Sequence, residues 1–287
     1  MAPTTGIRET LRKFDAFFDA VDVDTKVRLQ KALDVIHRAI DIFGLEGVCF
    51  SFNGGKDSTV VLHLLRIVVA KRVLEEVKAA QDATKVTKVT TTTVTSPRHH
   101  VLDVDLVSAE ELEARVAQAL GRLPVMYFDS HDQFPQVRDF IEHCNTTFAL
   151  QCHVYKCSFV EGVKDMLDRL HIKGVYMGVR GGDPHTEDLE HYSPSTPGWP
   201  PFLRVNPILR WTYQDVWDFL RECGLEYCSL YDHGYTSLGN IYDTVQNPAL
   251  WVSGENGAEG YYLPAHALKD GNSERCGRQK RARTTSK

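Results

Sequence analysis

Apolar residues recur at helical spacing in two stretches near the start of the chain, residues 7–19 and 25–43. The repeating apolar positions are Ile7, Leu11, Phe14, Phe17, Phe18, Val27, Leu33, Ile36, Ile40 and Phe43. Steps of three or four residues place such side chains on one face of a helix. Gly44 follows the second stretch, where a residue that ends a helix is expected. The pattern predicts two amphipathic helices that pack on a core.

Further along, short apolar runs alternate with helical stretches. The predicted strands cover residues 48–52, 123–128, 147–154 and 174–179. The predicted helices cover residues 59–70 (continuing to about residue 80), 108–120, 135–144, 158–170 and 213–222. This alternation predicts an α/β fold with a mostly parallel, twisted, Rossmann-like sheet and helices on both faces. Ligands of such sheets bind beyond the carboxyl ends of the strands, which here are residues 53–57, 129–132 and 180–183.

Two stretches interrupt the alternation. Residues 81–102 are rich in threonine and predict an exposed insertion, either disordered or forming a peripheral strand. Residues 180–204 are punctuated by proline and glycine and predict a long loop, which in a compact domain is usually functional. We expect residues 1–250 to form a single domain and residues 251–287 to form a polar tail with a basic end.

The segment Ser51–Thr59, SFNGGKDST, joins the first predicted strand to the helix after it. Glycines let a backbone approach a phosphate closely, and the start of a helix presents free N–H groups and positive charge. Lys56 adds a mobile charge, and Asp57 could hold a metal ion or, with Ser58, cap the helix. The segment lacks the spacing of a Walker loop. It predicts a phosphate-binding loop, the alternative being a structural strand–helix turn.

Composition narrows the class of protein. The net charge of −5 over 287 residues argues against nucleic acid as a partner. Seven cysteines, an odd number without a Cys-x-x-Cys pair, suit a reducing compartment. No secretory signal or membrane-length apolar run is evident, so we expect a cytoplasmic enzyme with no membrane partner. Cys152, His153 and Cys157 resemble part of a metal site, but no second ligand pair follows, which favours packing.

The loop Asn53–Ser58 resembles the PP-loop of ATP pyrophosphatases, whose fold is adenine nucleotide α-hydrolase-like. Four stretches together resemble the eukaryotic-type FAD synthase (FMN adenylyltransferase) family, a relative of phosphoadenylyl-sulfate (PAPS) reductase. They are residues 51–59, 177–184, 199–209 and 227–239. Weaker similarity extends through residues 274–278, and the whole covers about residues 25–278. Thr196 departs from the family, since some relatives carry an acidic residue there.

The resemblance implies a nucleotidyltransferase that joins FMN and ATP to give FAD and pyrophosphate. The FMN phosphate would attack the α-phosphorus of ATP in line. Magnesium is expected because it holds phosphates in register. ATP and FMN are the implied small-molecule partners, and apo-flavoproteins are candidate clients for the FAD.

The resemblance also implies roles for particular residues. The implied catalytic residues are Lys56, Asp57 (also the metal ligand), Arg275 and Arg278. The implied ATP-binding residues are Ser51, Phe52, Asn53, Gly54, Gly55 and Ser58. The implied flavin-binding residues are Arg180, Asp183, Trp199, Arg204 and Tyr235. Structural alternatives are a solvated basic tail for the arginine pair, a turn for Asp183, local packing for Trp199 and surface ion pairs for Arg180 and Arg204.

Other functions compete with adenylyl transfer. Residues 222–225, Glu-Cys-Gly-Leu, resemble the catalytic segment of PAPS reductase, but Glu226 stands where that enzyme has histidine. Cys223 also lies at the end of a predicted amphipathic helix, which favours a structural role. A non-catalytic flavin or nucleotide sensor is a second alternative. An RNA-modifying PP-loop enzyme would need a more basic surface.

Overall fold

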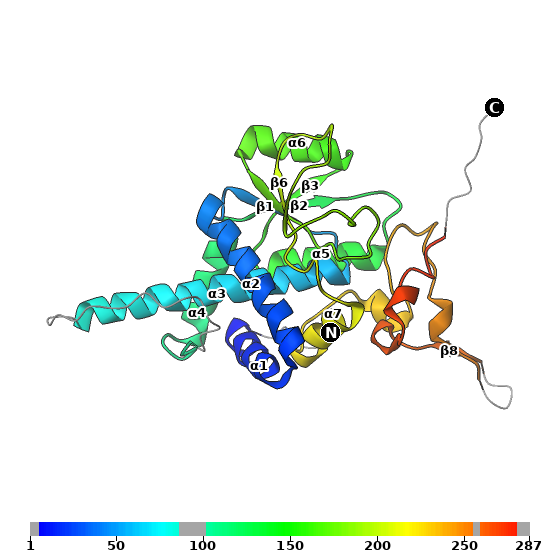
Figure 1. Ribbon diagram of the computed structural model, residues 1–287, viewed down its shortest axis with the longest axis horizontal. Coiled ribbons are helices and arrows are strands. Elements are labelled where there is room, and N and C mark those ends of the chain that lie inside the picture. Colours follow the sequence, from blue (N-terminus) through cyan, green and yellow to red (C-terminus); the bar gives the residue numbers. More distant parts are fainter. Residues whose placement is uncertain (1–5, 86–101, 255–258, 280–287) are drawn as a thin grey trace.

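The computed structural model describes residues 6–85, 102–254 and 259–279, and its elements are shown in Figure 1. The helices are α1 (Ile7–Ala20), α2 (Val23–Phe43), α3 (Lys56–Lys85), α4 (Ala109–Leu120), α5 (Pro135–Thr147), α6 (Phe159–Leu170) and α7 (Tyr213–Glu222). The main strands are β1 (Val48–Ser51), β2 (Pro124–Phe128), β3 (Gln151–Tyr155), β4 (Gly174–Tyr176), β5 (Tyr192–Pro194) and β6 (Leu203–Val205). A short hairpin, β7 (Trp251–Val252) and β8 (Tyr261–Tyr262), lies in the C-terminal part.

The six main strands form one sheet in the order β3-β2-β1-β4-β6-β5. All neighbouring pairs are parallel except β5 and β6, which are antiparallel at one edge. β1 and β4 therefore lie side by side in the middle, and the segments that follow them emerge at the same edge. The predicted mostly parallel α/β fold is confirmed.

Helices cover both faces of the sheet, but unequally (Figure 1). On one face, α6 alone packs on a small core that includes Cys49, Met126 and Val175. The other helices contribute to the larger core on the opposite face. Adjacent residues of β1 point to opposite faces, so Cys49 belongs to the small core and Phe50 to the large one.

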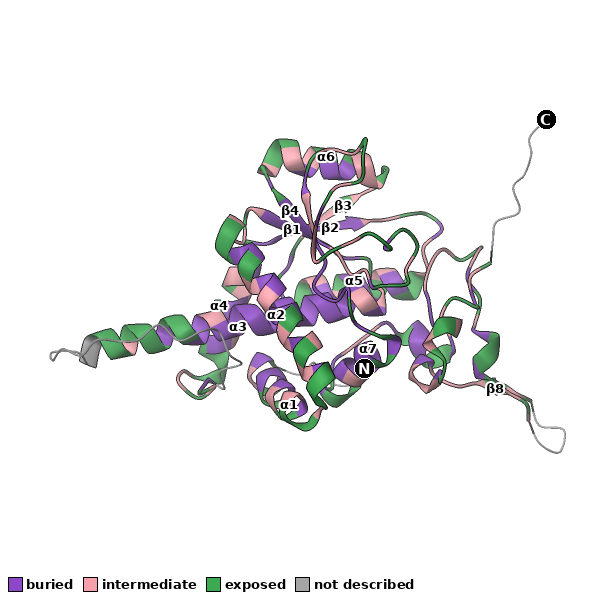
Figure 2. Ribbon diagram, viewed as in Figure 1, coloured by how far each residue is buried: buried purple, intermediate pink, exposed green. Residues whose placement is uncertain are grey.

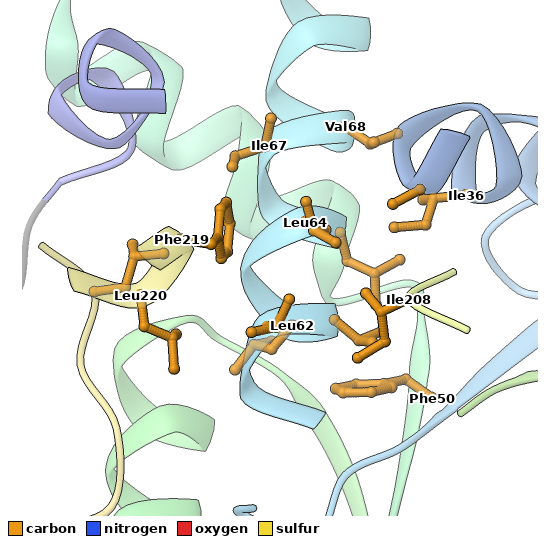
Figure 3. Close-up of a cluster of buried hydrophobic side chains, with 14 of the residues drawn as sticks. Ile36, Phe50, Leu62, Leu64, Ile67, Val68, Ile208, Phe219 and Leu220 are labelled. Atoms are coloured by element: carbon orange, nitrogen blue, oxygen red, sulfur yellow. The ribbon is translucent and has the colours of Figure 1, made fainter. Parts of the chain in front are cut away.

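α3 passes through the middle of the larger core. Its first half is buried on nearly every side, whereas its far end is exposed, as Figure 2 shows. Figure 3 shows Leu62, Leu64 and Ile67 of α3 among side chains from α2, β1 and α7. A fully buried Leu or Ile side chain stabilises the fold by about 1.5–3 kcal/mol relative to its exposed state. This packing fixes the start of α3, which follows the glycine turn.

Local signals explain several element ends. The Asp22 side chain accepts hydrogen bonds from the backbone N–H groups of Asp24 and Thr25 at the start of α2. Gly44, with φ of 70°, ends that helix as predicted. Ser158 with Glu161, and Thr212 with Asp215, form capping boxes at the starts of α6 and α7.

Other boundaries differ from the prediction. α3 begins at Lys56, so Asp57 and Ser58 lie in its first turn and are not its N-cap. The strand expected from residue 147 begins at Gln151, because α5 continues through Thr147. The predicted loop at residues 180–204 contains β5 and the start of β6, which are too short to give an apolar pattern. Of the threonine-rich insertion, residues 81–85 belong to α3, and residues 86–101 lie outside the described residues.

The described C-terminal part packs against the domain. Ala265 and Leu268 are buried in the larger core beside residues of α7. In Figure 1 the orange and red segments lie beyond α7 and one end of α5. Within the described parts of the chain, no helix is both long enough and apolar enough to cross a membrane.

Candidate active site

The glycine turn after β1 is held by one side chain. Asn53 Oδ1 accepts hydrogen bonds from the Gly55 N–H at 3.0 Å and from Ser58 Oγ at 2.7 Å. Gly54 has φ of 70°, and a Cβ there would lie 3.0 Å from Val137 Cγ1 on α5. A side chain at this position would therefore be both strained and crowded. The predicted phosphate loop thus has a fixed backbone between β1 and α3.

Ser51 and Phe52 join the turn to the sheet. Ser51 is the last residue of β1, and the Phe52 N–H donates to the Met126 carbonyl at 3.0 Å. The Phe52 ring is 1% exposed and packs with the rings of Phe50 and Phe140. Its side chain therefore anchors the turn in the core.

The segment after β4 runs beside the start of α3. A Cβ on Gly178 would lie 2.7 Å from the backbone nitrogen of Ser58 and 2.8 Å from its Cα. Only glycine permits so close an approach of two backbones. Arg180 and Asp183 follow, and the Arg180 N–H donates to Asp183 Oδ2 at 2.8 Å. The carboxyl ends of β1 and β4 thereby supply one site.

A network of four charged side chains lies where these segments meet. Lys56 Nζ is 2.9 Å from Asp57 Oδ2, and Arg180 Nε is 2.6 Å from Asp57 Oδ1. Both cations also contact the Glu274 carboxylate. Lys56 and Arg180 are 1% and 5% exposed. Buried charges of this kind persist only when paired.

The network shifts the protonation of its members. Burial acts to raise the pKa of Asp57, but the adjacent Lys56 and Arg180 outweigh it and bring the pKa below its ordinary value. Burial acts to lower the pKa of Arg180, but Asp57 and Glu274 raise it overall. Asp57 is therefore ionised at neutral pH and serves as the shared counter-ion of both cations.

Sequence reasoning missed Glu274. The family resemblance extends through residues 274–278 but implies roles only for Arg275 and Arg278. Glu274 is 218 positions from Lys56, so no local pattern indicates their contact. Its neighbourhood is fixed by loop residues, since Thr236 Oγ1 donates to the Glu274 carbonyl at 2.6 Å. The Tyr231 hydroxyl, from a neighbouring segment, accepts the Lys56 N–H at 2.8 Å.

A cavity of about 540 Å³ adjoins the network. Its lining includes Arg180, Asp183, Thr212, Tyr213, Glu274 and Arg275. It therefore lies between the segment after β4, the start of α7 and the C-terminal part. Arg180 and Asp183, two of the residues expected to bind flavin, are among those that line it.

The remaining expected flavin residues lie in two other places. Arg204 packs on the Trp199 ring, with its Cζ 5.2 Å from the ring centroid, and donates to Thr196 Oγ1. Trp199 also packs on Phe159 of α6. Tyr235 forms an edge contact with Phe134, with ring centroids 5.5 Å apart.

The two tail arginines have different surroundings. Arg275 is exposed and lines the cavity. Arg278 donates to the Leu238 carbonyl at 3.0 Å and pairs with Asp243 at 3.3 Å. They lie in one turn, because the Arg278 N–H donates to the Arg275 carbonyl at 2.9 Å. Arg275 is thus placed toward the cavity, and Arg278 fastens the turn.

Asp183 carries an energetic cost at neutral pH. Burial raises the pKa of Asp183, against the opposing effect of its hydrogen bond from the Arg180 N–H. A carboxyl group whose pKa is raised by folding makes the folded state less stable as it ionises. This stability is lost as pH rises from the ordinary pKa of the group, about 4, through the raised pKa. A carboxyl group with a shifted pKa in a cavity lining is a candidate functional group.

Asp183→Asn is therefore expected to raise the melting temperature at pH 7. The amide oxygen can still accept the Arg180 N–H, and the cost of burying a charge is gone. The gain should disappear as pH falls below about 4, where the wild-type carboxyl is protonated. Thermal unfolding of both proteins across pH 3–8 would check this, and a lower melting temperature at pH 7 would contradict it.

Two further sequence patterns contain cysteines that could do chemistry. Cys223 follows α7 and is fully buried, and burial raises the pKa of its thiol to about 12. Such a thiol is a poor nucleophile. Among the described residues no three His, Cys, Asp or Glu side chains gather as a metal site, and Cys152, His153 and Cys157 lie on or just after β3.

Known proteins resemble this chain over most of its length. The family described as phosphoadenosine phosphosulfate reductase domain matches residues 47–164 and 156–246. A probable FAD synthase of Schizosaccharomyces pombe is 32% identical over 252 residues, covering 88% of this chain and 78% of that protein. A probable FAD synthase of Caenorhabditis elegans is 30% identical, covering 96% of this chain but only 49% of the nematode protein.

The fold has solved counterparts. The crystal structure of Candida glabrata FMN adenylyltransferase in complex with FAD and inorganic pyrophosphate superposes with a TM-score of 0.72. It is 20% identical and is covered completely, together with 98% of this chain. The structural match confirms the α/β fold. The glycine turn and the buried cation pair accompany 32% sequence identity to the Schizosaccharomyces pombe protein. The chain belongs to the FAD synthase family, built on the PAPS reductase domain.

Proposed function

We propose that the chain is an ATP:FMN adenylyltransferase, which converts FMN and ATP to FAD and pyrophosphate. The observation that carries the proposal is the pair of buried cations, Lys56 and Arg180, at the end of a fixed glycine turn. A cavity of about 540 Å³ opens beside Arg180. The identity of 32% to a probable FAD synthase supports the choice of substrates.

The chemistry needs positioning more than acid–base catalysis. The FMN phosphate is already anionic, so it can attack the α-phosphorus of ATP without a strong base. The enzyme must bring two polyanions together and stabilise the charge that develops on the leaving diphosphate. We assign this diphosphate to the Lys56 side chain and to those backbone amides of Gly54–Ser58 that Asn53 and Tyr231 do not already accept, with Arg180 and Arg275 nearby. Asn53 and Ser51 would hold the turn at the nucleotide.

Magnesium fits the site in one way. Both Asp57 carboxylate oxygens already accept from Lys56 and Arg180. A cation would therefore take most of its ligands from phosphate oxygens and water, with Asp57 adding at most one, as Mg²⁺ commonly does. Bound there, magnesium would neutralise phosphate charge.

The flavin would meet three parts of the chain. Asp183 would accept hydrogen bonds from the donor edge of the isoalloxazine, and its position in the cavity lining supports this. Trp199 and Arg204 form a stacked pair that would offer a flat surface and a positive charge. Tyr235 would close the groove from the loop that follows residues 229–233.

We also propose how the chain is divided into a domain and a tail, and in which compartment it acts. Residues 1–250 would form the PP-loop domain and residues 251–287 the tail, whose described part presents Arg275; the burial of Ala265 and Leu268 supports this. All seven cysteines are free, which suits the reducing cytoplasm that we infer. The FAD produced would supply apo-flavoproteins there.

The direct test is incubation of the purified chain with ATP, magnesium and FMN. Chromatography should show FAD, and a coupled assay should show pyrophosphate in equal amount. Binding of both substrates without either product would instead indicate a flavin or nucleotide sensor. Reduction of phosphoadenylyl sulfate would indicate the reductase alternative, which the burial of Cys223 argues against.

A further inference from the structure

The cation pair of the site is already neutralised within the chain. The Lys56 and Arg180 side chains are 2% and 6% exposed, and each contacts both Asp57 and Glu274. Two positive and two negative charges therefore cancel. A diphosphate added to this network would meet no net positive charge. Either one of the two carboxylates moves away from the cations, or the affinity of the site for an anion is low.

Of the two carboxylates, Asp57 is the less able to move. It lies in the first turn of α3, whose following residues are buried in the core. Glu274 has a longer side chain and lies in a turn of the C-terminal part. It also lines the cavity of about 540 Å³, so its carboxylate has space into which to rotate.

We propose that Glu274 is a built-in competitor for the diphosphate site. Its carboxylate holds Lys56 and Arg180 in the ligand-free chain, and it swings away when a diphosphate, as the end of a nucleotide or as free pyrophosphate, takes its place. It returns as the diphosphate leaves. This inference rests on the proposed function only in taking the cation pair as the diphosphate site.

The movement is confined to the side chain, because the backbone around Glu274 is fastened on both sides. Thr236 Oγ1 donates to the Glu274 carbonyl at 2.6 Å, and Asn247 Nδ2 donates to the Ser273 carbonyl at 2.8 Å. The Val245 N–H donates to the Gly277 carbonyl at 2.9 Å. Thr236 and Asn247 are 1% and 0% exposed, so these bonds are shielded from water.

Competition between Glu274 and the diphosphate would favour release of the product pyrophosphate. Pyrophosphate is a small, highly charged product that two buried cations would otherwise retain. An internal carboxylate that regains its ion pairs as the product departs lowers the affinity for pyrophosphate. It also keeps Lys56 and Arg180 aligned between cycles. Glu274 is thus a positioning residue that acts through these cations.

The test is titration of the full-length protein with inorganic pyrophosphate by calorimetry, without FMN and without divalent metal. Glu274→Gln keeps the shape of the side chain and removes its charge, so its Kd for pyrophosphate should fall by about tenfold or more. Glu274→Asp keeps the charge but shortens the reach, so its Kd should fall by less. Glu187→Gln, on an exposed position of the segment after β4, is the matched control for the loss of one charge and should stay within about twofold of wild type.

Unchanged or weaker pyrophosphate binding by both Glu274 variants would overturn the proposal, as would equal tightening in Glu187→Gln. Failure of every protein to bind pyrophosphate would overturn it too, because removal of the competitor should expose the cations. If Glu274→Gln does not fold, Glu274→Asp decides alone. Because the titration involves no turnover, tightening in a chain that never forms FAD would refute the proposed function and leave this inference standing.

Discussion

Asp57→Ala is expected to lower kcat/KM for FAD formation by about 10²–10³-fold, the range found when one preorganised electrostatic group is removed from an active site. Asp57 holds Nζ of Lys56 at 2.9 Å and Nε of Arg180 at 2.6 Å. Without it, the two cations share only Glu274 and lose the geometry that places them at the glycine turn. Steady-state kinetics with ATP and FMN each varied would measure the effect.

The same substitution should destabilise the fold, because removing one partner of a buried ion pair costs about 3–5 kcal/mol. Activity must therefore be compared at a temperature where circular dichroism shows both proteins folded. Asp57→Asn separates the two effects, since it keeps the side-chain volume and one acceptor oxygen. Near-wild-type turnover in Asp57→Asn would show that charge at this position is dispensable.

A matched control tests whether any lost aspartate–arginine pair has this effect. Asp41 lies 2.6 Å from Arg72 on the surface of α2 and α3, and its side chain is 60% exposed. Exposed pairs contribute about 0–1 kcal/mol. Asp41→Ala should therefore leave kcat/KM unchanged and shift the melting temperature little.

The parts of this site that local sequence determines were predictable. The turn at Asn53–Ser58 needs a strand, two glycines and a helix in succession, and all three are visible in adjacent residues. The alternation of strands and helices likewise predicted that the ends of β1 and β4 face one edge. What local sequence specifies is the backbone of the phosphate loop and its place on the sheet.

The partners of that loop could not be predicted, because they depend on contacts between distant segments. Glu274 reaches Lys56 across 218 positions, and Tyr231 binds the Lys56 N–H across 175. The antiparallel strand β5 was missed because three residues, one of them Pro194, give no periodic pattern. Asp57 was predicted as a catalytic residue and metal ligand, with a helix cap as the alternative, but its pairing with Arg180, 123 positions away, could not be predicted.

Arg275→Ala is expected to lower kcat for FAD formation by about 10²–10³-fold, the range found when one group that stabilises developing charge is removed. Arg275 is exposed at the cavity, so its guanidinium is available to a ligand. Its planar fork binds phosphate oxygens in pairs, and Arg275→Lys should recover only part of the loss. The Kd for FMN, measured by flavin fluorescence, should change by less than about twofold, because the effect falls on the nucleotide phosphates.

Arg278→Ala should be measured beside Arg275→Ala, because Arg278 fastens the turn that carries Arg275. It should lose the hydrogen bond to Leu238 and the ion pair with Asp243, costing about 1–2 kcal/mol and lowering the melting temperature by about 2–4 °C. Arg275→Ala should leave the melting temperature nearly unchanged. Catalytic loss without destabilisation in Arg275→Ala, and loss with destabilisation in Arg278→Ala, would distinguish a phosphate ligand from its support. Wild-type kinetics in both variants would instead show that the arginine pair takes no part in catalysis.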